Sequence, residues 1–173
     1  EFAVQPITGQ VVEAEFKKAR NSAAGMDSWE IQDMAMLSEG CYSWIARLYN
    51  LIEKGAPWPK SACKARAAYL SKDASRPEEP LAYRVLMILT HLYRRWASLR
   101  LGHLKQWTQQ WGMPQMYAGV GNKSAEDAWY SLAVTTELWQ LQGRSYCGGT
   151  ADIVKCFDQI NRRLVDRLAH EAG

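Results

Sequence analysis

The sequence lacks the residue pairs that build disulfide scaffolds and zinc sites. Its four cysteines lie far apart without a Cys-x-x-Cys pair, and its three histidines show no ligand spacing of the His-Glu-x-x-His type. We therefore interpret the chain as neither a disulfide-rich secreted domain nor a zinc enzyme. A reducing setting, cytoplasmic or nuclear, is expected.

Long apolar runs and a strong charge of one sign are missing as well. No stretch approaches the ~18 consecutive apolar residues of a membrane helix, so we expect no membrane partner. With 47% hydrophobic and 23% charged residues among 173, the chain has the composition of a globular domain that can bury a core. Its net charge of +3 permits an anionic partner without requiring one.

Apolar residues at three- and four-residue steps predict most of the chain to be helical. The pattern runs over residues 27–54, with a break at Ser38 and Gly40, and again over 90–111, 124–142 and 157–172. Two capping boxes are expected, one from Asp27 to Glu30 and one from Ser124 to Asp127. On these helices Trp44, Trp96, Trp107, Trp129 and Trp139 fall on apolar stripes, where we expect them in the core.

Between the helices, two short runs are typical of a β-hairpin. Residues 66–72 and 83–89 alternate or run apolar as strands do, and the polar, proline-rich segment 73–80 forms the expected loop. Lys72 ends the first run and Arg84 begins the second. Pairing of the two runs would therefore bring both cations to the same tip.

A second strand is predicted near the end of the chain, over "TADIVKC" at residues 150–156. Asp152 lies within it, and burial of an ionised carboxylate is costly unless a metal ion or a hydrogen-bond network compensates the charge. Binding of Mg²⁺ by Asp152 is one interpretation. The simpler alternative is that Asp152 borders a turn and that Asp158 caps the following helix.

Five stretches follow one another along the chain: "AAGMDSW", "LYNLIEKGAPWPKSACKARAAYLSKD", "YRVLMILTHLYRRWASLRL", "YAGVGNKSAEDAW" and "ADIVKCFDQINR". In this order they resemble segments of the reverse transcriptases of non-LTR retrotransposons and group II introns. Together they run from about Ala23 to Gly173. The resemblance implies a mainly α chain with a small β component, an α+β fold. It would form the fingers and part of the palm of a right-hand polymerase, with a fingers hairpin and one palm strand.

Roles for single residues follow from the resemblance. Asp152 matches the first catalytic aspartate of the palm, which binds Mg²⁺ together with the carbonyl of Ile153. Lys72 and Arg84 match the fingers residues that hold the dNTP triphosphate, and Phe157 matches the steric gate that excludes ribonucleotides. The reaction implied is RNA-directed DNA synthesis, with an RNA template, a DNA primer and a dNTP as partners.

The chain departs from the family at two places. Val85 stands where the family usually has proline, and the later aromatic-x-Asp-Asp metal element is absent because the sequence contains no Asp-Asp pair. We therefore expect a fragment that does not polymerise by itself. Its segments are an N-terminal extension over 1–22, for which a helix is considered, a fingers-like region over 23–145 and the start of a palm over 146–173.

Other interpretations stay open beside this one. The basic residues Arg94, Arg95, Arg100 and Lys105 could follow a nucleic-acid backbone, although such charges more often form a solvated helix face. A non-enzymatic helical module that binds protein or nucleic acid is the alternative function. Self-association through the unpaired palm strand is a further expectation.

Overall fold

The computed structural model describes residues 4–153 and 156–172, without the side chains of Trp111, Phe157, Asp158 and Ala172. Two compact units divide the described chain, one formed by Gln5–Gln106 and the other by the residues from Trp107 onward together with Val4. The helix α4 (His91–Trp111) crosses from the first unit into the second. The first is the N-terminal unit and the second the C-terminal unit.

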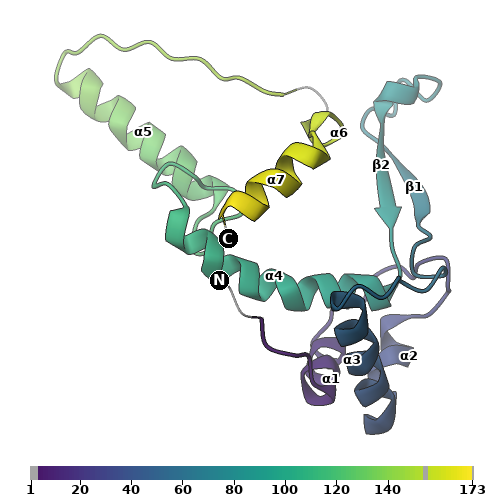
Figure 1. Ribbon diagram of the computed structural model, residues 1–173. Helices are drawn as coiled ribbons and strands as arrows, with labels where there is room; N and C mark the ends of the chain where they lie inside the picture. Colours follow the sequence, from purple (N-terminus) through teal and green to yellow (C-terminus); the bar gives the residue numbers. More distant parts are fainter. Residues whose placement is uncertain (1–3, 154–155, 173) are drawn as a thin grey trace. The chain divides into compact units, whose positions relative to one another are not determined.

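The N-terminal unit contains the helices α1 (Gly9–Lys17), α2 (Ile31–Ala35) and α3 (Glu39–Glu53), then the hairpin strands and most of α4. In Figure 1 the hairpin stands out from the helices α1 to α3. The N-terminal extension is thus helical over α1. The expected break is confirmed at Ser38, which is the N-cap residue of α3, whereas Gly40 lies within α3.

The core of this unit lies between α1, α2 and α3. Its buried side chains are Ile7, Val12, Phe16, Ile31, Met34, Tyr42, Ala46 and Tyr49, and Leu92, Trp96 and Leu99 of α4 pack against them. Two buried hydroxyl groups find carbonyl acceptors: Tyr42 donates to Met34 and Ala35 at 3.0 and 2.9 Å, and Tyr49 donates to Leu92 at 2.7 Å. Burial raises the pKa of Tyr49 far above its usual range, so this hydroxyl remains a donor.

Gly25 is required by a close approach between two backbones. A Cβ atom built at this position would lie 2.8 Å from the backbone nitrogen and Cα of Thr90, closer than real contacts allow. The segment before α2 therefore runs directly over the start of α4. Arg94 fastens the same segment, because its guanidinium donates to the Ala23 carbonyl at 2.6 Å.

Of the two capping boxes predicted at helix N-termini, one is present and the other is not. Ser124 and Asp127 form the expected capping box of α5 (Ala125–Leu141). The box expected at Asp27 and Glu30 is wrong. Glu30 is itself the N-cap residue of α2, and its partner is Asp33. Ser28 has a φ of 60°, outside the helical range, so a helix cannot begin at Asp27.

The strands β1 (Arg66–Ser71) and β2 (Tyr83–Ile88) form an antiparallel hairpin, within one residue of the predicted bounds. Arg66 pairs with Ile88, and Ser71 pairs with Tyr83. The loop returns through the 3₁₀ helix Pro80–Ala82. The mainly helical fold with one small hairpin is therefore confirmed.

The C-terminal unit holds α5, the short helix α6 (Cys156–Gln159) and α7 (Arg162–Ala172). Residues 144–153 form no helix or strand, and Asp152 and Ile153 are exposed there. The strand predicted over 150–156 is therefore not formed in its described part, while Val154 and Lys155 lie outside the described residues. A physical reason is that no other strand of this unit lies beside the segment within the described residues, so its backbone has no ladder to join.

Two of the tryptophans predicted to lie in the core are exposed instead. Trp44 is 67% exposed and Trp129 is 71% exposed, whereas Trp96 packs against the core. On α3 the buried ridge is Tyr42, Ala46 and Tyr49, which leaves Trp44 outside with the Arg47 guanidinium 5.3 Å from its ring. Across the described residues, no helix is both long and apolar enough to cross a membrane.

Candidate functional site

The register of the hairpin places Lys72 and Arg84 on one face. Arg84 lies opposite Leu70, and the ladder continues past β1 because the Lys72 N–H donates to the Ala82 carbonyl at 2.7 Å. Side chains two residues apart on a strand point to the same side, so Lys72 shares a face with Leu70 and therefore with Arg84. They are diagonal neighbours across the strands, ~7–8 Å apart at their backbones. The predicted meeting of the two cations at the tip agrees with this register.

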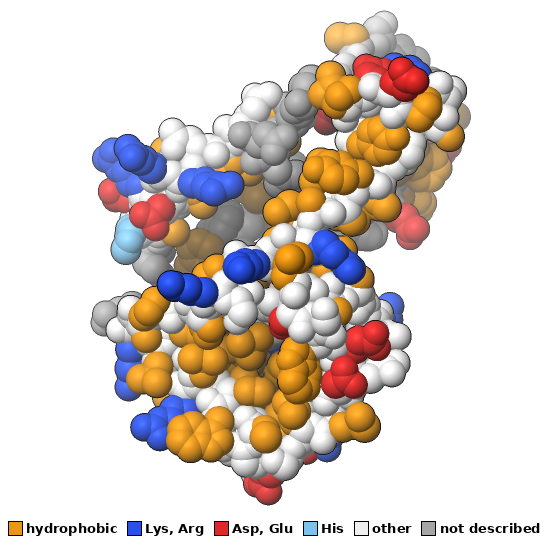
Figure 2. Space-filling view, turned by 90° about the vertical axis from the view of Figure 1, so that its right-hand side faces the viewer, with side chains coloured by type: hydrophobic (Ala, Val, Ile, Leu, Met, Phe, Trp, Pro, Cys, Tyr) orange, Lys and Arg blue, Asp and Glu red, His pale blue; other side chains and the backbone are white. Residues whose placement is uncertain are grey.

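The two faces of the hairpin differ in chemistry. The face with Lys72 and Arg84 also carries Arg66 at its far end, and we call it the basic face. The opposite face carries Tyr69, Tyr83, Val85 and Met87 and no Lys or Arg between residues 67 and 87. In Figure 2 the hairpin is the arm at the upper right, with hydrophobic side chains along its length and charged ones at its tip. Ala68, Leu70, Leu86 and Ile88 lie between the cations on the basic face, so both faces are largely apolar along the strands. The difference between them is that only the basic face carries cations, two at the tip and one at the far end.

The three cations of the basic face are all exposed. Within the described part of the chain, no hydrogen bond or ion pair engages the side chain of Lys72, Arg84 or Arg66. Arg76 in the loop is different, because it donates to Asp73 at 2.8 Å and to Glu79 at 3.0 Å. The donors of Arg66, Lys72 and Arg84 are thus available to an external anion, whereas Arg76 is already paired with two carboxylates.

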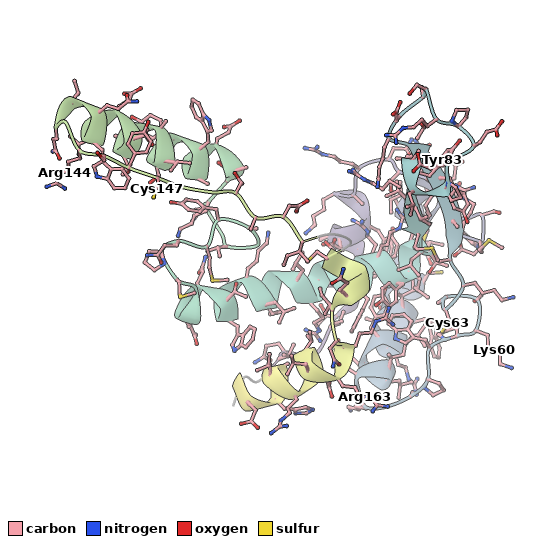
Figure 3. All side chains as sticks on the ribbon, turned by 90° about the horizontal axis from the view of Figure 1, so that it is seen from above. Lys60, Cys63, Tyr83, Arg144, Cys147 and Arg163 are labelled. Atoms are coloured by element: carbon pink, nitrogen blue, oxygen red, sulfur yellow. The ribbon has the colours of Figure 1, made fainter. Side chains whose placement is uncertain are left out.

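The loop between the strands is ordered by Asp73. Its carboxylate accepts from the backbone N–H and the hydroxyl of Ser75 at 2.9 and 2.6 Å, and from Arg76. The bonds from Ser75 and then from Arg76 hold the pKa of Asp73 below its usual value, so Asp73 is ionised at neutral pH. Tyr83, labelled in Figure 3, donates to the Pro77 carbonyl at 2.8 Å and closes the loop from the other side.

The arginines considered for nucleic-acid binding are engaged within the N-terminal unit. Arg94 donates to Ser22 and Ala23, and Arg95 lies 3.5 Å from the buried carboxylate of Glu15. Arg100 binds both carboxylate oxygens of Glu53. These guanidinium groups fasten α4 to residues 5–53. Lys105 is exposed on the same helix.

Glu53 of α3 accepts hydrogen bonds from two side chains of α4. It accepts from Arg100 Nε at 2.6 Å and from the indole N–H of Trp96 at 2.8 Å. The hydrogen bond from Arg100 is the largest cause that lowers the pKa of Glu53, and the bond from Trp96 adds to it. A carboxylate held in this way stabilises the attachment of α4 to α3.

The residues expected to bind Mg²⁺ are not assembled into a site. Asp152 and Ile153 lie in the exposed segment without regular structure, and the side chain of Phe157 in α6 lies outside the described residues. No group of three or more His, Cys, Asp or Glu side chains that could hold a metal ion occurs within the part described. Two Mg²⁺ ions need more carboxylate oxygens than Asp152 supplies, so the described residues do not fit a two-ion centre.

No family model matches the chain, and neither the curated proteins nor the solved structures gave a significant match.

Two features of the hairpin were missed in the sequence. Arg66 belongs to the basic face, and its even spacing from Lys72 on one strand is a signal that could have shown it. Asp73 organises the loop, and the pattern Asp-x-Ser-Arg is typical of a side chain that bonds the backbone two residues on. Both signals are local and could be read without the structure.

Proposed function

We propose that the chain is the fingers-bearing part of a retroelement reverse transcriptase, and that its hairpin binds the triphosphate of a dNTP. The observation that supports this most is the pair Lys72 and Arg84, exposed on one face and without intramolecular partners. An ammonium group and a forked guanidinium suit the oxygens of a polyphosphate. The resemblance of the segments around them to the family adds the identity of the ligand.

The proposal assigns binding, rather than chemistry, to this chain. In the family Mg²⁺ would stabilise the charge that develops at the transferred phosphoryl group, and Asp152 would be one of its ligands. Because the described residues do not fit a two-ion centre, no catalytic step is assigned to them. We therefore expect no Mg²⁺-dependent primer extension by the chain alone.

The test is dNTP binding by the purified chain, measured as a dissociation constant by titration calorimetry. We expect Lys72→Ala and Arg84→Ala each to weaken dNTP binding about tenfold or more, since each removes one charge-assisted contact. The same variants should bind a dNMP as weakly as the unaltered chain does, because the β- and γ-phosphates are missing.

Arg66→Ala is the matched control. It removes an exposed cation from the same face, ~20 Å along the strand from Lys72, and should change dNTP binding less than about twofold. Equal losses in all three variants would show a general attraction of polyanions and contradict the proposal. No preference for dNTP over dNMP would contradict it as well.

A non-enzymatic binding module is the second candidate function. The observation that favours it is the large number of exposed apolar side chains on α5 and α7. Asp152→Asn separates the two functions. It should leave the binding of a macromolecular partner intact, whereas in a polymerase that contains this segment it should abolish DNA synthesis.

A further inference from the structure

The segment between α1 and α2 is attached to the first turn of α4 by the side chain of Arg94. Its guanidinium donates through Nη1 to the Ser22 hydroxyl at 3.2 Å and through Nη2 to the Ala23 carbonyl at 2.6 Å. Two residues further on, Gly25 lies directly against the backbone of Thr90. Arg94 therefore holds residues 22–25 at the position where the two backbones meet.

His91 gives Arg94 a further contact, and this contact requires one protonation state. Nη2 of Arg94 lies 3.2 Å from Nε2 of His91. A guanidinium group has only donors, so Nε2 is the acceptor and the proton of the ring is on Nδ1. The side chain of His91 is fully buried. The geometry thus contains a neutral His91 that accepts a hydrogen bond from Arg94.

The charged groups around His91 come from α4, from α1 and from the attached segment. On α4, Arg95 is the second cation beside Arg94, and it lies 3.5 Å from the Glu15 carboxylate of α1. In the segment, Asp27 has a buried Oδ1 atom without a hydrogen-bond partner among the described residues. Burial, followed by the charges of the two arginines, lowers the pKa of His91. A backbone hydrogen bond with the segment and the charge of Asp27 oppose this shift.

A proton on His91 reverses the role of Nε2. The atom becomes a donor, so its hydrogen bond with Arg94 is lost and two cations face each other at 3.2 Å. His91 is fully buried, whereas Arg94 is only half-buried, so the side chain that can move away is that of Arg94. Its departure also breaks the hydrogen bonds to Ser22 and Ala23.

We propose that His91 and Arg94 form a pH-sensitive latch, in which protonation of His91 releases residues 22–25 from α4. The release is local, because none of the residues 20–30 supplies a side chain to the hydrophobic core. Phe16 of α1 and Ile31 of α2, on either side of the segment, keep their own places in that core. The latch does not involve the hairpin, so this inference holds or fails independently of dNTP binding.

The experiment measures backbone order in the whole chain by ¹⁵N relaxation, from pH 7.5 down to about 4.5. The order parameter is about 0.85 in rigid backbone and below about 0.6 in flexible backbone. We expect the amides of residues 22–25 to pass from the rigid to the flexible value as His91 is protonated. The amides of α3 should stay rigid over the same range. The ring signals of His91 report its protonation in the same samples.

Four variants separate the latch from a general effect of acid. His91→Gln keeps an acceptor for Arg94 and cannot be protonated, so residues 22–25 should stay rigid at every pH. Arg94→Ala removes the attachment, so the segment should be flexible already at pH 7.5. Asp27→Asn removes a charge that favours the protonated ring, so release should begin at a lower pH. His103→Gln, on the same helix, is the matched control and should keep the response of the unaltered chain.

Four outcomes would overturn the inference. The first is a segment that stays rigid while the ring signals show a protonated His91. The second is a segment that loosens at the same pH in His91→Gln as in the unaltered chain. The third is a rigid segment in Arg94→Ala at pH 7.5. The fourth is a His91 ring that stays neutral until α3 itself unfolds.

Discussion

The N-terminal and C-terminal units use the same kinds of residue with opposite results. In the N-terminal unit α3 packs against α1 and buries Tyr42 and Tyr49 completely. In the C-terminal unit α5 is slightly longer than α3 and rich in apolar residues, yet no side chain described from residue 107 onward is buried. Helical period and apolar content are therefore sufficient to form a helix, while burial depends on a second element at the right distance.

The largest expected effect comes from replacing one aromatic side chain in each unit. Phe16→Ala should lower the free energy of unfolding by about 3–5 kcal/mol, because it opens a cavity where the ring is 1% exposed. Trp129→Ala should change it by less than about 0.5 kcal/mol, since the indole is 71% exposed. Urea unfolding followed by circular dichroism measures both.

A large loss in Trp129→Ala would show that α5 is covered in solution, and would remove the difference between the units. In a dimeric sample that loss should depend on protein concentration. The measurement is therefore repeated at a concentration at which sedimentation shows monomers.

A smaller effect is expected from the ion pair that attaches α4 to α3. Arg100→Ala should cost about 2 kcal/mol of unfolding free energy, because it removes a bidentate bond to Glu53 whose side chains are only 14% and 26% exposed. Lys17→Ala is the matched control, since its pair with Glu13 is an exposed one on a single helix. The control should change the free energy of unfolding much less than Arg100→Ala does. Similar losses in the two variants would contradict the distinction between them.

The smallest effect is a pH dependence at the start of α4. Burial, followed by the charges of Arg94 and Arg95, lowers the pKa of His91 below its ordinary value of 6.5, while Asp27 opposes the shift. The unfolded chain therefore binds a proton at a higher pH than the folded chain. The contribution of His91 is complete above pH 6.5 and decreases as the pH falls from there toward the lower pKa.

Chemical unfolding at pH 7.5 and at several lower values, down to about 5, measures this dependence. In His91→Gln the part of the pH dependence that belongs to His91 should disappear. His170→Gln on the exposed end of α7 serves as the control and should keep the slope of the unaltered chain. An unchanged slope in His91→Gln would show that other groups cause the acid sensitivity.

The local elements could be predicted from the sequence, because their signals lie within a few residues. The hairpin and α4 each begin or end within one residue of the predicted position, and Ser124 caps α5 as its spacing to Asp127 indicated. The position of Lys72 at the tip of the hairpin follows from the same local pattern.

What the sequence could not show are partners that are far apart along the chain. Arg94 reaches the Ala23 carbonyl, Arg100 reaches Glu53, and Tyr49 reaches Leu92 across more than 40 residues. The apolar stripe of α3 likewise predicted Trp44 inside, whereas the ridge that faces α1 is made of tyrosines and alanine. Which side of a helix is buried depends on the element that packs against it. The spacing of apolar residues along one helix does not specify that element.

The contact between Ile7 and Asn50 has a consequence for where an autonomous folding unit begins. The Asn50 side chain accepts from the Ile7 N–H at 2.9 Å and donates to its carbonyl at 2.7 Å, as a neighbouring strand would. Residues before position 23 also supply Val12 and Phe16 to the core. A polypeptide trimmed to start at Ala23 would thus lose a large part of its buried core, and proteolysis that removes this leading segment should release an unfolded remainder.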